Sequence, residues 1–409
     1  MDVYRNVSSW KKPFHITRAN LAKLWAGLFP QVEVIGITGS VGKTTTKEAI
    51  DSVLSSPAFA KSPTGKQFTV HSSVGNLDPV FNIPQTLLKI RPWTKKVVLE
   101  LGIEYPGEMD FYLSLVRPKI GVITRIYWTH TEFLGDLEGV IFEKGKLLKA
   151  LPKTGFAVLN YDDEYIREMA KMTKTQIFWY GSHPHEVDLQ ISDFLHQGRD
   201  GSRFKLRHQD KEIEVSWKLI GEHQTVAAAA AAAVGILSGL GFDQIKLGLE
   251  KLQPQPHRMN LLDGPAQSLI LDDSYNSSPL AVIMALETLR SLAHKGRAIA
   301  VLGDMLELGK YEEAGHREVG AKISEINLDY LITLGQRAKI IANEAKKLGV
   351  KNILESNDIT QIVSEIKKIA SKDDVILVKA SRHTHFERIV GSLTGKSTQI
   401  SCSICGNLT

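Results

Sequence analysis

The sequence predicts an α/β protein with two successive domains, a central P-loop domain with a mainly parallel sheet and a C-terminal Rossmann-like domain. Apolar, β-branched runs alternate with stretches of helical periodicity along most of the 409 residues, as in parallel sheets covered by helices. A glycine-rich loop, GITGSVGKTTT at residues 36–46, follows the first apolar run and precedes a helical stretch. A segment rich in proline and polar residues, 252–264, divides the alternation into two series.

The first series is expected to form the central domain, residues 32–257. Its polar part, residues 186–217, contains short strand-like runs and is expected to be an antiparallel flap or an extension of the sheet. Helical periodicity is present around residues 107–116 and 138–151. The expected strands are 32–38, 95–102, 119–126, 155–160 and 176–181.

The second series is expected to form the C-terminal domain, residues 264–393, with residues 394–409 as a tail. The tail contains Cys402 and Cys405, a C-x-x-C pair without the further cysteine or histidine ligands of a zinc site. Two tail thiols are therefore the favoured interpretation. The expected strands of this domain are 268–274, 297–304, 329–335 and 374–381.

Composition and charge exclude several classes of protein. Hydrophobic residues make up 43% and charged residues 23%, as in ordinary globular proteins. The net charge of +5 suits an enzyme that handles anions, but no dense block of Lys and Arg indicates nucleic-acid binding. The N-terminus lacks the apolar core of a signal peptide, and the longest apolar run, 226–237, is too short to cross a bilayer. We expect a cytoplasmic monomer with small-molecule partners and no membrane contact.

The glycine loop has the form T-G-x-x-G-K-T, with Ile37 at the place where the common phosphate loop has its first glycine. Gly39 and Gly42 allow backbone N–H groups to turn toward a polyphosphate at the helix N-terminus. Lys43 is expected to reach the β- and γ-phosphates, and the Thr44 hydroxyl to bind Mg²⁺. No N-K-x-D motif for reading a guanine base is present.

The order of several motifs resembles that of the Mur ligases over residues 32–392. These motifs are TGSVGKTT, LELG, THTE, GEH, HR, LDDSYNSSP, VLGDMLELG and VKASR. The resemblance implies an ATP-dependent, ADP-forming amide-bond ligase that acts through an acyl phosphate. It is strongest to the branch that adds D-alanyl-D-alanine to a UDP-N-acetylmuramoyl-tripeptide in peptidoglycan synthesis.

The resemblance also implies a metal and phosphate site. It assigns Mg²⁺, with two ions expected, to Thr44, Glu100, His130 and a carbamylated Lys144, although Lys146 leaves the register of that lysine open. The catalytic residues implied are Lys43, Lys144, His130 and Arg258. The implied ATP contacts are Gly39, Ser40, Val41, Gly42, Lys43, Thr44, Thr45, His223, Gln224, Arg258 and Asp273. The implied substrate contacts are Asn76, Asn276, Lys379, Ser381 and Arg382.

The sequence departs from the family pattern in several places, and two of these departures bear on the nucleotide parts of the ligands. Gln224 and Ala227 stand where the family has two asparagines near the adenine; the Gln224 side chain can still form a hydrogen bond there, and that of Ala227 cannot. Only residues 1–31 precede the first expected strand, so a UDP-binding domain is expected to be truncated or absent. Two alternatives therefore remain open: a related amide ligase with a non-UDP acceptor, such as a folylpolyglutamate or another polyamide, and a non-catalytic ATP-binding protein.

Overall fold

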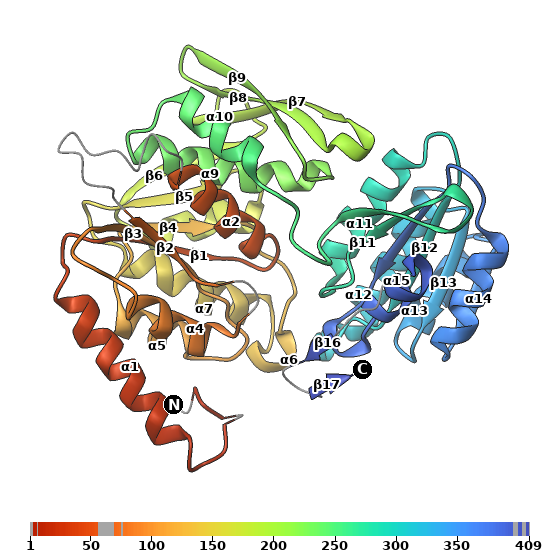
Figure 1. Cartoon of the computed structure of the whole chain (residues 1–409), viewed down its shortest axis with the longest axis horizontal. Coiled ribbons are helices and arrows are strands. Elements are labelled where there is room, and N and C mark those ends of the chain that lie inside the picture. The colour runs from red at the N-terminus through yellow and green to blue at the C-terminus, as the bar shows by residue number, and fades with distance from the viewer. Residues whose placement is uncertain are drawn as a thin grey trace. The chain divides into compact units, whose positions relative to one another are not determined.

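The computed structural model describes residues 3–5, 7–55, 69–74, 77–395, 400–402 and 406–408, and it divides into two compact units (Figure 1). The first unit comprises Met1–Leu195, Arg203–Trp217 and Gln224–Leu252. The second comprises His196–Ser202, Lys218–His223 and Gln253–Thr409. The change of unit at Gln253 lies within the proline-containing segment 252–264.

The first unit is built on a sheet whose strand order is β2-β3-β1-β4-β5-β6-β7-β8-β9. All pairs from β2 to β7 are parallel, so β7 joins the sheet as an extension of it. The strands are β1 Glu33–Thr38, β2 Thr69–Ser72, β3 Thr94–Glu100, β4 Ile120–Ile123, β5 Phe156–Asn160, β6 Gln176–Gly181, β7 Leu189–His196, β8 Ser202–His208 and β9 Lys211–Trp217.

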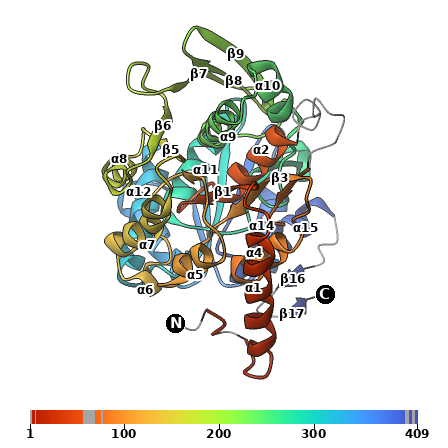
Figure 2. The same cartoon turned by 90° about the vertical axis from the view of Figure 1, so that its left-hand side faces the viewer.

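Helices cover both faces of this sheet. In both views α2 and α9 lie on one face, and α4, α5 and α7 lie on the other (Figures 1 and 2). The alanine-rich sequence of α9 is buried and allows it to pack closely on α2. The helices of this unit are α1 Lys12–Gly27, α2 Lys43–Leu54, α4 Pro79–Leu87, α5 Glu108–Leu115, α6 Thr131–Leu134, α7 Leu137–Ala150, α8 Glu164–Met169, α9 Thr225–Leu237 and α10 Phe242–Lys251.

The second unit has a smaller sheet in the order β10-β11-β15-β12-β13-β14, parallel except for β10. One core packs α11, α12 and α13 on the sheet, and another packs α14 and α15. The strands are β10 Asn260–Asp263, β11 Leu269–Asp272, β12 Ala298–Gly303, β13 Tyr330–Leu334, β14 Ile353–Ser356 and β15 Val375–Lys379. The helices are α11 Pro279–Leu292, α12 Glu312–Glu325, α13 Ala338–Lys347, α14 Ile359–Ile369 and α15 Glu387–Thr394.

The predicted fold class is confirmed. Every strand with a predicted range is present, and its observed ends differ from the predicted ends by at most three residues. The edge strands β2, β10 and β14, each of four residues, were not predicted from the sequence. The expected tail contains a further antiparallel pair, β16 Ile400–Cys402 and β17 Gly406–Leu408. Among the described residues, no helix combines the length and apolar character needed to cross a membrane.

Candidate active site

The glycine loop connects β1 to α2 and owes its shape to two glycines with positive φ. Gly39 has φ 147°, and Gly42, which caps the N-terminus of α2, has φ 85°. A Cβ at position 39 would lie 2.1 Å from Oγ1 of Thr124, so only glycine fits there. Thr124 Oγ1 also donates a hydrogen bond of 2.6 Å to the Val41 carbonyl. The loop is thus fixed at the start of a 12-residue helix, whose N-terminal N–H groups attract phosphate.

Hydrogen bonds fix Ser40 within this loop and hold the Lys43 side chain against it. The N–H of Ser40 donates to the Arg125 carbonyl at 2.6 Å, and its Oγ donates to the Tyr127 carbonyl at 2.8 Å. Lys43 Nζ donates to the carbonyls of Gly39 and Ser40 at 2.9 and 3.3 Å. The ammonium group of Lys43 therefore lies beside the loop, where a phosphate bound to the loop would meet it.

Two oxygen groups suited to Mg²⁺ meet at the next residue of α2. Thr44 Oγ1 donates a hydrogen bond of 3.1 Å to Oε1 of Glu100, the last residue of β3. β3 pairs with β1 so that Glu100 lies opposite Ile37, just before the loop. The N–H of Glu100 donates to Ser73 Oγ at 3.0 Å, which fixes the end of the strand. A hydroxyl and a carboxylate are ligand types that Mg²⁺ prefers, so this pair fits the ion implied by the resemblance.

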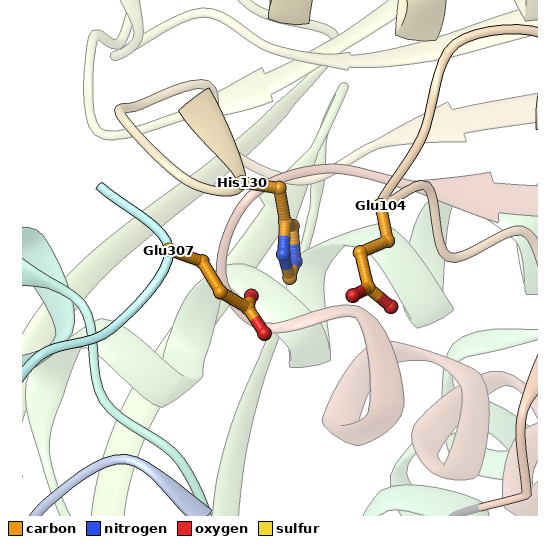
Figure 3. A group of neighbouring side chains, drawn as sticks. All are labelled: Glu104, His130 and Glu307. Atoms are coloured by element: carbon orange, nitrogen blue, oxygen red, sulfur yellow. The ribbon is translucent and has the colours of Figure 1, made fainter. Parts of the chain in front are cut away.

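His130 lies near a second carboxylate of the first unit, that of Glu104 (Figure 3). A ring nitrogen of His130 and a carboxylate oxygen of Glu104 lie within 4.8 Å of one another. His130 has φ 56° and caps the short helix α6, an uncommon conformation for a residue other than glycine. The sequence analysis did not select Glu104, although it follows Glu100 by four residues in the loop after β3. Figure 3 also labels Glu307, which belongs to the second unit.

Lys144 is a fully buried lysine on α7 whose Nζ has no hydrogen-bond partner among the described residues. Burial, reinforced by the charge of Lys43, lowers its pKa well below the usual lysine value, although Glu108 and Glu143 oppose the shift. Both of these carboxylates are hydrogen-bonded to backbone N–H groups, Glu108 to that of Glu104 and Glu143 to that of Gly107. Burial without a hydrogen-bond partner thus favours the neutral amine of Lys144 over its ammonium form.

Lys146, two residues along the same helix, is in a different environment. Its Nζ pairs with Asp110 and Glu143 at 2.6 Å each, and its side chain is 18% exposed. Burial alone would lower the pKa of Lys146, but the hydrogen bonds to Asp110 and Glu143 raise it above the usual value. Lys146 is therefore paired with two carboxylates, and Lys144 is the one of the two whose environment favours a neutral amine.

In the second unit, Arg258 is held between two residues in the left-handed conformation. His257 has φ 60° and Met259 has φ 53°. The Arg258 guanidinium stacks on the Tyr275 ring with its Cζ 4.0 Å from the ring centre, and the Arg382 Cζ lies 4.5 Å from the same centre. The buried Nε of Arg258 has no hydrogen-bond partner among the described residues. The arrangement leaves a buried donor of a permanent cation without an acceptor.

Asp273 and Lys379 form an ion pair within the second unit. Lys379 Nζ contacts Asp273 Oδ2 and donates a hydrogen bond of 2.9 Å to the Asn276 carbonyl. The other oxygen of Asp273 accepts from the N–H of Met259 at 3.2 Å. Ser381 Oγ accepts from the N–H of Leu306 at 2.9 Å. These contacts bring four of the residues expected to bind ATP or substrate, Asp273, Asn276, Lys379 and Ser381, into the second unit's own hydrogen-bond network.

The remaining residues singled out in the sequence lie at the start of α9, in α2, in β16 or outside the described residues. His223 and Gln224 lie in the 3₁₀ turn Glu222–Gln224 that leads into α9, and Gln224 is buried. Ala227 is buried in α9 and offers no side-chain hydrogen bond. Thr45 is buried in the first turn of α2. Asn76 and Cys405 lie outside the described residues, and Cys402 ends β16.

Comparisons with known proteins match both parts of the chain. Residues 37–235 match the Mur ligase middle domain, and residues 257–382 match the Mur ligase glutamate ligase domain. The chain is 34% identical over 364 residues to the UDP-N-acetylmuramoyl-tripeptide–D-alanyl-D-alanine ligase of Bacillus subtilis strain 168. That alignment covers 88% of this chain and 75% of the relative.

Two further comparisons extend the similarity. The Escherichia coli K12 ligase of the same name is 30% identical over 387 residues, which cover 93% of this chain and 82% of the relative. The crystal structure of MurF ligase from Thermotoga maritima in complex with ADP matches with a TM-score of 0.80 at 27% identity. This match covers 93% of this chain and 84% of the solved one. The similarity therefore includes both sequence and backbone over most of the chain.

Proposed function

Because the chain belongs to the Mur ligase family, whose members are ATP-dependent, ADP-forming ligases, we propose that it adds D-alanyl-D-alanine to a UDP-N-acetylmuramoyl-tripeptide-like acceptor in peptidoglycan synthesis. In this reaction the acceptor carboxylate takes the γ-phosphoryl group of ATP. The dipeptide amine then displaces phosphate from the acyl phosphate and forms the amide. The structural observation that carries the proposal is the unpartnered amine of Lys144, whose pKa is lowered partly by the neighbouring Lys43 of the glycine loop.

The first unit supplies the groups for phosphoryl transfer. The loop amides and Lys43 bind the β- and γ-phosphates, and Lys43 balances their charge. Thr44 and Glu100 would hold one Mg²⁺, and His130 and a carbamylated Lys144 would hold a second. When bound, the ions neutralise charge on the phosphoryl group and on the oxyanion that forms as the amine attacks. We assign the adenine contacts to Gln224 of this unit and to His223, which belongs to the second unit.

Carbamylation of Lys144 is supported by its environment. The neutral amine attacks CO₂, a nitrogen–carbon bond forms, and one proton leaves, which gives a carbamate anion. A buried lysine with a lowered pKa has the lone pair that this step needs, whereas the paired ammonium of Lys146 does not. The product replaces an unpartnered donor by an anion that can bind a metal, beside the cation of Lys43.

The second unit supplies charge and orientation for the amine and the transferred phosphoryl group. Arg258 meets the γ-phosphate, and its unpartnered buried Nε supports such a role. Asp273 and Lys379 fix the geometry of the loop after β11, and we assign Asn276, Ser381 and Arg382 to the amine substrate. We propose that the protein acts as a cytoplasmic monomer on these small molecules.

The proposal is tested by measuring ADP formation with every combination of acceptor and amine. We expect turnover that requires both a UDP-linked muramoyl tripeptide and D-alanyl-D-alanine, and loss of turnover in Lys43→Ala. Turnover with a folylpolyglutamate or another acceptor without UDP would instead favour a related amide ligase that acts on a non-UDP acceptor. Turnover that no acceptor or amine changes would contradict the proposal.

A further inference from the structure

The short segment that carries Arg258 is held in a conformation that its own residues disfavour. His257 and Met259, on either side of Arg258, both have positive φ, which is uncommon for residues with a side chain. Such residues persist only where surrounding contacts hold them. The contacts around this segment therefore identify what fixes the direction of the Arg258 side chain.

The segment after β11 provides these contacts. The N–H of Tyr275 donates to the His257 carbonyl at 3.1 Å, and the N–H of Met259 donates to Asp273 Oδ1 at 3.2 Å. The backbone is thus fixed on both sides of Arg258, and the guanidinium rests on the ring of Tyr275. The same short stretch of chain holds the backbone and supports the cation.

The side chain of His257 adds a further contact. Its Nδ1 lies 2.8 Å from Oδ2 of Asp272, a carboxylate that is 3% exposed. Oδ1 of Asp272 accepts hydrogen bonds from the Oγ and the N–H of Ser274 at 2.6 and 3.1 Å, so the carboxylate cannot rotate freely. Asp272 therefore holds His257 through a fixed, buried acceptor.

We propose that His257 is a positioning residue: its hydrogen bond to Asp272 fixes the strained turn that aims the Arg258 guanidinium at the phosphoryl group transferred from ATP. The inference rests on the proposed function, because that function identifies the anion that Arg258 meets. It also assigns a task to the first aspartate of the LDDSYN motif. Asp272 acts through His257, whereas Asp273 pairs with Lys379.

The protonation state of His257 follows from the groups that face it. The hydrogen bond to Asp272 raises its pKa above the usual histidine value, burial opposes this, Glu387 adds to the rise and Arg382 lowers it. A protonated ring donates a charge-assisted hydrogen bond, which is stronger than a neutral one. Asparagine can offer a neutral N–H donor at the place of Nδ1–H, which makes His257→Asn a conservative replacement.

A double-mutant cycle in the full-length chain tests the proposal. His257→Ala, Arg258→Ala and the double variant are compared with wild type by kcat/KM for ATP in acceptor-dependent turnover. We expect His257→Ala to lower kcat/KM about tenfold to a hundredfold, as removal of a group that orients a ligand residue usually does. We expect no further loss when it is added to Arg258→Ala, and substantial recovery in His257→Asn.

A matched control is His183→Ala in the first unit. His183 Nδ1 also lies 2.8 Å from an aspartate oxygen, that of Asp162, and kcat/KM should not change in this variant. If His257→Ala reduced kcat/KM by the same factor with and without Arg258, His257 would not act through that arginine. Unchanged kcat/KM in His257→Ala, with only a lower unfolding temperature, would also overturn the proposal.

Failure of the proposed function can be distinguished from failure of this inference. The same cycle is measured on the affinity for a non-hydrolysable ATP analogue with Mg²⁺, which requires no acceptor. If wild type binds the analogue but joins no acceptor to an amine, the proposed function fails. The coupling between His257 and Arg258 can still be measured from the affinities of the four proteins for the analogue. Additive losses of affinity would contradict the positioning role, and wild type that binds no analogue would contradict both.

Discussion

Lys144 in the first unit and Lys379 in the second are both almost inaccessible to solvent, at 0% and 2% exposure, but they are buried in opposite ways. Lys144 Nζ has no hydrogen-bond partner among the described residues. Lys379 Nζ contacts the carboxylate of Asp273 and the carbonyl of Asn276. Burial of an unpaired charge is costly, so an isolated buried lysine loses its proton, whereas a paired one can keep its charge.

The difference in pairing indicates a chemical role for Lys144 and a structural role for Lys379. The first unit holds an amine whose pKa is lowered, which suits covalent modification and metal binding after it. The second unit holds a cation that is already matched and that ties β15 to the loop after β11. In that unit the group assigned to an anion is Arg258, whose buried Nε has no hydrogen-bond partner among the described residues.

The largest expected effect is that of Lys144→Met on catalysis. Removing the amine removes the carbamate and with it the proposed ligand of the second metal ion. We expect kcat to fall about a hundredfold to a thousandfold, the range for loss of one electrostatic group at a transition state. The unfolding temperature should stay the same or rise, because an unpartnered buried donor is replaced by an apolar group of similar length. Turnover and thermal unfolding are measured on the same preparation.

Lys146→Met is the control for that variant. It removes a lysine from the same helix but leaves Lys144 in place, so most of the activity should remain. Labelling with ¹³CO₂ followed by carbon NMR adds a direct test, with a carbamate signal expected in wild type and in Lys146→Met but absent from Lys144→Met. If the carbamate signal were absent from Lys146→Met and present in Lys144→Met, the assignment of the modification to Lys144 would be wrong.

Lys379→Met should have the opposite profile, with stability as the main loss. The substitution leaves the Asp273 carboxylate, which is 15% exposed, without its cation. Breaking a buried pair from one side costs about 3 kcal/mol or more, so the second unit should unfold at lower denaturant concentration. Adding Asp273→Asn should restore part of the stability, as followed by denaturant unfolding. Equal unfolding of Lys379→Met and wild type would show that this pair does not stabilise the unit.

Much of the fold and part of this contrast could be predicted from the sequence. The long apolar runs predicted the central strands because buried parallel strands consist of such runs. The choice between Lys144 and Lys146 could also have been made from the sequence. The buried face of α7 follows the i, i+3, i+4, i+7 spacing of one helix face and contains Val140, Glu143, Lys144, Leu147 and Leu148. Lys146 lies off that face.

Other features could not be predicted because long-range contacts impose them. The strands β2, β10 and β14 lie at sheet edges and are only partly buried, so they lack the continuous apolar run that reveals β4 and β11, which are equally short. The left-handed conformations of His130, His257 and Met259 are unfavourable locally and depend on contacts distant in sequence. Glu104 carries no motif and becomes a candidate only when its carboxylate lies near His130.

Gly39→Ala should have a smaller effect than the lysine substitutions, confined to nucleotide binding by the first unit. The added Cβ would meet Thr124 Oγ1, and φ 147° is unfavourable for alanine, so the loop must shift. We expect about tenfold weaker binding of an ATP analogue by calorimetry, on the order of 1.4 kcal/mol. Gly135→Ala, which also replaces a glycine of positive φ but has open space around its Cβ position, is the control and should leave the affinity unchanged.

The smallest expected effect concerns the pH dependence of stability in the second unit. Because the folded-state pKa of His257 is raised, its protonation stabilises the folded state most at pH below the unfolded histidine pKa of about 6.5. That contribution is lost as pH rises through the folded-state pKa. The stability difference between wild type and His257→Asn should therefore shrink over that rise, as followed by unfolding at a series of pH values. A difference that is constant or grows with pH would contradict the assigned protonation state.

The most direct test of the proposed function is mass spectrometry of the products formed from ATP, Mg²⁺, a UDP-N-acetylmuramoyl-tripeptide and D-alanyl-D-alanine. We predict a product whose mass equals acceptor plus dipeptide minus one water, formed with one ADP per product and absent when either substrate is omitted. Lys144→Met should form it only in trace amounts. ADP release without this product, or ligation only to acceptors that lack UDP, would contradict the assignment.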